Sequence, residues 1–139
     1  MINDVYKGIS AECKIVNPTA KVYRDNTPQN FTTPAFLVEQ INFSPARSIN
    51  GKQRISVQLD LKYFPDGETK DYLNKCRLMQ EELSRHFHVL EGSFYVKDRS
   101  FKVTDNVLHF QFTVDYTEAL VAGETPMQEL ETNTNMKED

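Results

Sequence analysis

In residues 106 to 116 of the chain, NVLHFQFTVDY, apolar and polar side chains alternate strictly from Leu108 to Tyr116. Successive side chains of a β-strand point to opposite faces, so this stretch predicts a strand with one apolar and one polar face. The apolar face carries Leu108, Phe110, Phe112, Val114 and Tyr116, and the polar face carries His109, Gln111, Thr113 and Asp115. We expect helices to cover the apolar face, and solvent or a partner to meet the polar one.

The same alternation recurs over residues 53–64, where one face carries Ile55, Val57, Leu59, Leu61 and Tyr63. Runs rich in β-branched and aromatic residues predict further strands at 21–25, 35–43 and 93–104. Asp105 and Asn106 suit the tight hairpin turn that joins the strand at 93–104 to the strand at 107–120. The chain therefore predicts about five strands.

Two segments have the three- and four-residue spacing of an amphipathic helix. The first stripe comprises Ile2, Val5, Ile9, Cys13 and Val16, and Asn17-Pro18 ends it. The second, after turn and capping residues at 65–69, comprises Tyr72, Cys76, Met79, Leu83, Phe87 and Leu90. The order αβββαββ predicts an α+β fold in which two helices pack on one face of a mostly antiparallel sheet of about five strands.

At 139 residues, 39% of them hydrophobic, the chain suits one globular domain, which we expect over residues 1–122. Residues 123–139 contain five acidic side chains and one lysine, and this difference accounts for the whole net charge of −4. The only apolar residues there are Met127, Leu130 and Met136. We expect an acidic tail that is partly disordered or docks on a neighbouring subunit.

The neutral body lacks the excess of lysine and arginine that neutralises phosphates, so we expect no direct nucleic-acid recognition. A basic group, Lys97, Arg99 and Lys102, is flanked by aromatic residues, but strand alternation separates these side chains onto different faces. An ordinary solvated or partner-facing strand is the favoured interpretation of this group.

The longest apolar run, AFLV at 35–38, is far shorter than the roughly 20 residues of a membrane helix. The N-terminus also lacks the basic and apolar regions of a secretory signal, so we expect cytoplasmic synthesis and no membrane partner. Cys13 and Cys76 occupy apolar helix positions, which favours buried thiols over a disulfide.

No pattern of a catalytic or metal site is present in the sequence. His86 and His88 lie two residues apart, which on a helix is about 200° of rotation, and they cannot share a metal there. No serine or cysteine lies in a nucleophile elbow, and the five glycines form no phosphate-binding loop. We expect no catalytic residue, no metal and no cofactor.

A resemblance to a known family rests on several stretches that follow one another along the chain. They are INDVYKGISAEC, KVYRDNTPQNFTTPAFLVEQI, LDLKYFPDG, VLHFQFTVDY and PMQELE. Together they resemble the small tail terminator proteins of prophages and phage-derived bacteriocins in Gram-positive bacteria, over nearly the whole chain. The resemblance implies a structural phage protein that caps the tail tube as a ring, usually a hexamer, ends tail polymerisation and forms the tail side of the head-tail joint. It implies as partners further copies of the chain, the tail tube protein and the head-tail connector protein. It also implies assembly in the bacterial host cytoplasm and a final place in the virion or tail-like particle.

Exposed aromatic and apolar side chains commonly anchor interfaces. At each candidate position below, simple packing within the chain is the alternative to a role in an interface. On this basis the candidate contact residues are Gln29, Phe31 and Pro34 in the proline-rich loop, Tyr63 and Phe64 at a strand end, and Met127 and Leu130 in the tail.

Three other functions remain open from the sequence. A head-tail connector or tail-completion protein of the neck would be equally small, acidic and without catalytic residues. A nucleic-acid adaptor would show binding that falls steeply with salt. A small-molecule enzyme would need a pocket with perturbed titrating groups, and no motif supports one.

Overall fold

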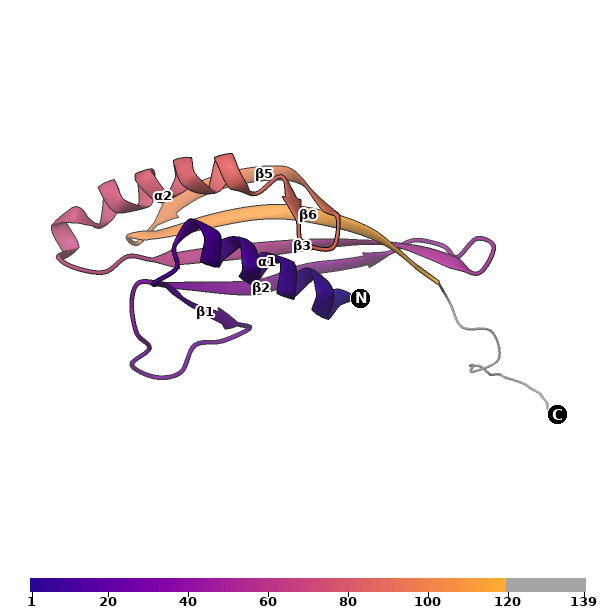
Figure 1. Ribbon diagram of the computed structural model, residues 1–139, viewed down its shortest axis with the longest axis horizontal. Coiled ribbons are helices and arrows are strands. Elements are labelled where there is room, and N and C mark those ends of the chain that lie inside the picture. Colours follow the sequence, from indigo (N-terminus) through magenta and orange to yellow (C-terminus); the bar gives the residue numbers. More distant parts are fainter. Residues whose placement is uncertain (120–139) are drawn as a thin grey trace. The chain divides into compact units, whose positions relative to one another are not determined.

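The computed structural model describes residues 1–119. Its elements are α1 (Ile2–Val16), β1 (Lys21–Arg24), β2 (Ala35–Pro45), β3 (Lys52–Phe64), the 3₁₀ turn η1 (Thr69–Asp71), α2 (Tyr72–His86), β4 (Val89–Leu90), β5 (Phe94–Thr104) and β6 (Val107–Ala119) (Figure 1). The α+β class and the order of the predicted elements are confirmed. Neither helix of this part of the chain has the length and apolar composition needed to cross a membrane.

Within residues 1–119 the sheet has six strands, one more than expected, because a two-residue strand follows α2. The second apolar stripe predicted a helix that continues as far as Leu90, but α2 ends at His86. Phe87 leaves the helical backbone conformation, with φ −84° and ψ 77°. Leu90 then pairs with Phe94 in β4, where it is still buried. The same core is therefore completed by a strand residue instead of a helix residue.

The strands lie in the order β1-β2-β3-β6-β5-β4, so β1 and β4 are the edge strands. β1 runs parallel to β2, whereas β5 pairs antiparallel with both β4 and β6. Asp105 and Asn106 have φ of 52° and 62°, the left-handed values that a two-residue type I′ hairpin requires. The predicted β5–β6 turn is confirmed.

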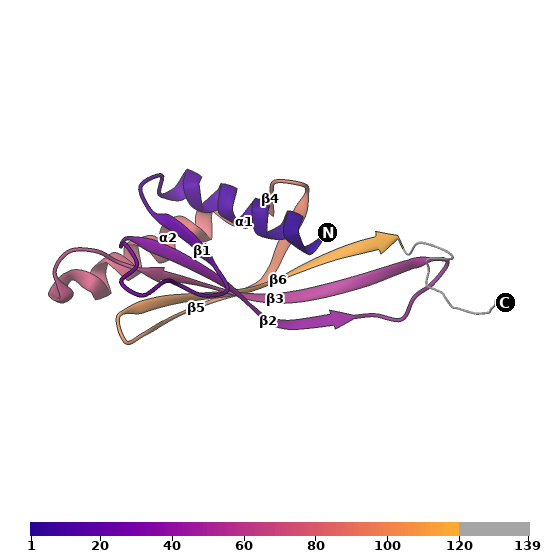
Figure 2. The ribbon, with the colours of Figure 1, turned by 90° about the horizontal axis from the view of Figure 1, so that it is seen from below.

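Both helices lie on one face of the sheet (Figure 2). The predicted apolar faces of β3 and β6 are buried throughout, which confirms their assignment: Ile55, Val57, Leu59, Leu61, Tyr63, Leu108, Phe110, Phe112, Val114 and Tyr116. Phe87, just after α2, packs against these strands, with its ring 5.4 Å from that of Phe110 and 5.8 Å from that of Phe112.

The chain divides into two compact units. The first comprises Met1–Phe43 and Ser56–Asp115, and the second comprises, among the described residues, Ser44–Ile55 and residues 116–119. Within the second unit, Ile49 and Lys52 exchange backbone hydrogen bonds of 2.9 and 3.0 Å around Asn50-Gly51. Positive φ at both turn residues makes this another type I′ hairpin. That residues 1–122 form one domain stays a prediction.

Candidate functional site

Three aromatic side chains from separate parts of the chain meet around the loop that leads into β2. Phe31 lies edge to face against Phe64 at the end of β3, with ring centroids 4.9 Å apart. Its ring also contacts that of Tyr23 in β1 at 6.0 Å. All three side chains are half-buried, so this aromatic cluster (Tyr23, Phe31 and Phe64) keeps some apolar surface open to a partner.

The aromatic cluster brings two of the predicted contact residues together and adds Tyr23, which sequence reasoning missed. Gln29 is exposed in the same loop, and Pro34 is half-buried directly before β2. Met127 and Leu130 lie outside the described residues. The only signal for Tyr23 is its place in the short strand KVYR, whose partner strand the sequence does not specify.

Tyr63 points away from the aromatic cluster and into the core. Only 5% of it is exposed, and its ring lies 5.2 Å from that of Phe36. This burial raises the pKa of Tyr63 to about 12. Adjacent strand residues face opposite sides, so Phe64 and Tyr63 cannot both belong to one contact surface.

The sheet face opposite the helices carries polar side chains that bind one another. Lys62 of β3 forms an ion pair with Glu39 of β2 at 2.5 Å. Asp115 of β6 accepts a hydrogen bond from the Ser56 hydroxyl and pairs with Lys97 of β5 at 2.6 Å. The face that the sequence predicted to meet solvent or a partner is therefore an ordered polar surface.

Asp60 is a buried carboxylate on this polar face, with 7% of the residue exposed. Its Oδ2 lies 3.2 Å from Nδ1 of His109. Its other oxygen, Oδ1, is buried without a hydrogen-bond partner among the described residues. A buried acceptor without a partner costs about 1–3 kcal/mol, so the burial of this oxygen lowers the stability of the fold.

A hollow of about 380 Å³ opens on the same face, over β5 and β6. Its lining is polar: Ser100, Lys102, Thr104, His109 and Gln111. Hydroxyl, ammonium and amide donors converge here, which suits contact with a polar or acidic group of a partner.

The basic group on β5 is largely engaged by its own chain. Lys97 binds Asp115, and the Arg99 guanidinium donates to the carbonyl oxygens of Ser84 and Phe87 at 2.9 and 3.2 Å. A cation at the end of α2 satisfies carbonyls that the helix leaves open. Two of the three basic side chains are therefore used within the chain and do not form a phosphate-binding surface.

The arrangement offers little covalent or metal chemistry. Within residues 1–119 no group of three histidine, cysteine or acidic side chains could hold a metal ion. Cys13 and Cys76 are free and buried, which confirms the prediction of buried thiols, and burial raises the pKa of both. A thiol with a raised pKa is a poor nucleophile near neutral pH.

Comparison with known proteins adds a family. A family model described as phage tail terminator protein matches residues 4–126 of the chain. The match begins in the first turn of α1 and continues past the end of β6, so it takes in both helices and all six strands. No curated protein matches the chain at a significant level.

Proposed function

The chain belongs to the phage tail terminator protein family, and on that basis we propose that it caps the tail tube as a ring. In this proposal the ring is a hexamer that ends tail polymerisation and forms the tail side of the head-tail joint. Membership itself makes the chain a structural, non-enzymatic component of the virion tail, with the tail tube as its partner.

The observation that carries the proposal is the family match over residues 4–126. The described surface agrees with it, because the aromatic cluster and the polar hollow leave side chains open to a partner. The aromatic cluster and the polar face are candidate surfaces for the tail tube protein and for the head-tail connector protein. Gln29, Phe31, Pro34 and Phe64 remain our candidates on the described part of the chain, and Met127 and Leu130 on the tail.

A ring places one further demand on the chain. Rings form through heterologous contacts, in which one patch of a subunit meets a different patch of the next.

The protein would assemble in the cytoplasm of the bacterial host and remain at the tail terminus of the virion or tail-like particle.

Deleting the gene from the phage or phage-like element tests the function. We expect tails of irregular, extended length that are not joined to heads, and restoration of normal length when the full chain is supplied from a plasmid. Electron microscopy of purified particles measures both properties. Tails of normal length that fail only to join heads would instead assign the protein to the neck, as a connector or tail-completion component.

A further inference from the structure

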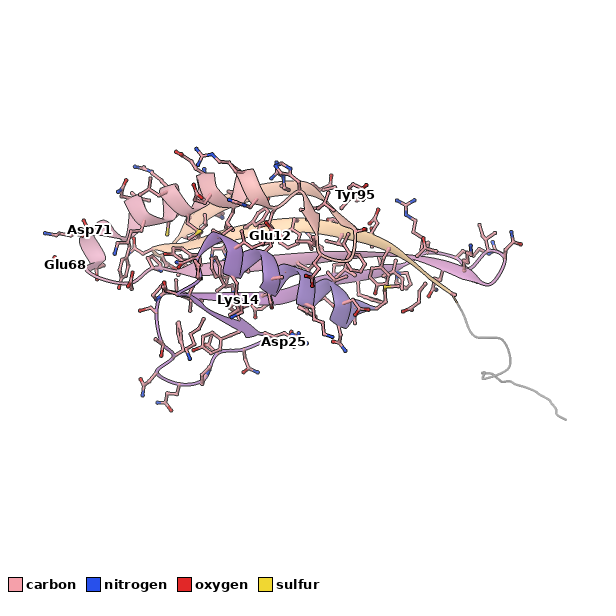
Figure 3. The ribbon with its side chains drawn as sticks, in the orientation of Figure 1. Glu12, Lys14, Asp25, Glu68, Asp71 and Tyr95 are labelled. Carbon is pink, nitrogen blue, oxygen red and sulfur yellow. The ribbon has the colours of Figure 1, made fainter. Side chains whose placement is uncertain are left out.

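Two pairs of exposed apolar side chains lie at opposite edges of the sheet. Ile41 and Phe43, 47% and 42% exposed, follow the part of β2 that pairs with β1. Val89 and Tyr95, 46% and 71% exposed, lie opposite each other on β4 and β5. Figure 3 shows Tyr95 projecting outward from the ribbon. All four residues belong to the first compact unit.

The β2 pair lies on the polar face of the sheet. Phe36 packs against Tyr63 on the helix-covered face, and alternation along a strand places odd-numbered residues of β2 on the other face. The ion pair of Glu39 with Lys62 agrees with this assignment, because Lys62 lies beside the buried Tyr63 and faces away from the helices. Ile41 and Phe43 continue the row that starts with Glu39.

The β4–β5 pair lies on the same face. Phe94 is buried, so its neighbour Tyr95 points to the side away from the helices. Lys97, two residues further, confirms this side through its ion pair with Asp115 of the polar face. Val89 is the register partner of Tyr95 and therefore shares its side.

Both edges are only partly covered by neighbouring strands. The pairing of β1 with β2 ends at Val38, although β2 continues to Pro45. β4 pairs with β5 only at Phe94 and Tyr95, although β5 continues to Thr104. Just beyond this pairing, the Val96 amide donates to the carbonyl oxygen of His88. Partly open strand edges pair readily with another chain, and native proteins usually cover or use them.

We propose that the occupant of each edge is a second copy of this chain. The β2 edge of one copy beyond Val38 meets the β4–β5 edge of the next copy, and Ile41 and Phe43 pack against Val89 and Tyr95 across the seam. This inference rests on the ring proposed above and names the surfaces that build it.

Three observations favour this occupant. First, when two sheets join edge to edge, each face of one sheet continues into the same face of the other. The β2 pair and the β4–β5 pair share a face, so they become neighbours at the junction. Second, the two edges differ, so each copy has one of each and the contact repeats around a ring. Third, the polar hollow lined by Lys102 and its neighbours lies further along β5 on the same face, so polar side chains follow the apolar pair on this strand.

Engineered cysteines test the proposal directly, because the two native thiols are buried and out of reach of a cross-linking reagent. Full-length Phe43→Cys and Tyr95→Cys variants are treated with a short bismaleimide, separately and mixed. We expect cross-linked dimers only in the mixture, at least tenfold above either variant alone, and a ladder up to the ring from the double variant. Ile15→Cys mixed with Leu78→Cys is the matched control, since these exposed apolar residues lie on the helices.

The same variants are cross-linked in purified tails that contain the chain. Dimers from Phe43→Cys alone would mean that the β2 edge meets itself, which overturns the proposal, as would equal cross-linking of the control pair. Terminated tails without a 43–95 cross-link would reject these edges and leave the ring function standing. A 43–95 cross-link in the purified chain, with tail length unchanged after gene deletion, would support the contact and reject the terminator function.

Discussion

His109 and Asp60 face each other on the polar side of the sheet, with Nδ1 of the imidazole 3.2 Å from Oδ2 of the buried carboxylate. A partly buried hydrogen bond of this kind stabilises a fold by about 1 kcal/mol. We expect Asp60→Asn and His109→Gln each to destabilise the chain, and the double variant to lose about 1 kcal/mol less than the sum. Urea denaturation of the four proteins measures this coupling. Arg77→Gln, on the exposed side of α2, is the control and should combine additively with Asp60→Asn.

Gly8 of α1 lies against Leu90 of β4 and against the backbone of Glu91, the residue that follows β4. A Cβ at this position would approach the carbonyl oxygen of Glu91 to 2.9 Å and Cβ of Leu90 to 3.0 Å. Alanine normally stabilises a helix by about 1 kcal/mol relative to glycine, but overpacking against a backbone costs about 1–3 kcal/mol. We expect Gly8→Ala to lower the free energy of unfolding, whereas the exposed Lys7→Ala should leave it nearly unchanged. An alanine variant as stable as the wild type would show that α1 can move away from β4.

Phe112 is fully buried against Phe87 and Phe110, and its neighbour Thr113 points to the opposite face. An unpaired buried carboxylate costs several kcal/mol, which is comparable to the roughly 5–15 kcal/mol that stabilises a whole domain. Phe112→Asp should therefore abolish cooperative folding. Thr113→Asp is the matched control, because residue 113 lies opposite Lys97 and should tolerate the charge. Circular dichroism and thermal melts distinguish the two, and a cooperatively melting Phe112→Asp would refute the assigned face.

The long strands and both helices could be predicted because each has a clear period and a clear stop. Two-residue alternation identified the buried faces of β3 and β6, and the left-handed backbone at Asp105 and Asn106 matches the predicted turn. β4 could not be predicted, because two residues show no period and Leu90 also fits the helical stripe of α2. The parallel pairing of β1 with β2 depends on tertiary contacts that no local pattern encodes.

The candidate surface was only partly predictable for the same reason. Phe31 and Phe64 were both identified, yet their meeting depends on the path of the loop between β1 and β2. Alternation along β3 already predicted that Tyr63 lies on the apolar face, and the residue is buried there. The same pattern gives no support to Tyr63 as a contact residue. The pair of Asp60 with His109 requires the register of two strands far apart in sequence, which composition does not determine.

The buried thiols predict a loss of stability at alkaline pH. Burial raises the pKa of Cys13 and Cys76 above the ordinary value of 9.0. Above pH 9 the unfolded chain therefore releases protons that the folded chain retains, and the free energy of unfolding falls as the pH rises. For each thiol the slope steepens as the unfolded chain ionises above pH 9, and its limit is about 1.4 kcal/mol per pH unit. Urea titrations of wild type and Cys13→Ala/Cys76→Ala compare the slopes, and an unchanged slope would contradict a role for the thiols.

The charge of the chain is concentrated in residues 123–139, which carry the whole net charge of −4. Tails of like charge brought together in a ring repel one another unless each docks on a neighbour or points into solvent. Docking would use Met127 and Leu130, the apolar residues within PMQELE, whose burial contributes a few kcal/mol at most at roughly 25 cal/mol per Å². We therefore expect deletion of residues 124–139 to leave the thermal melt of the body unchanged but to raise the concentration at which rings form and to give tails of irregular length. Met127→Ser/Leu130→Ser, which keeps the charge, should reproduce the effect if docking matters, and neutralising the acidic residues should not. A truncated chain that forms rings at the wild-type concentration and terminates tails at normal length would make this segment a passive extension.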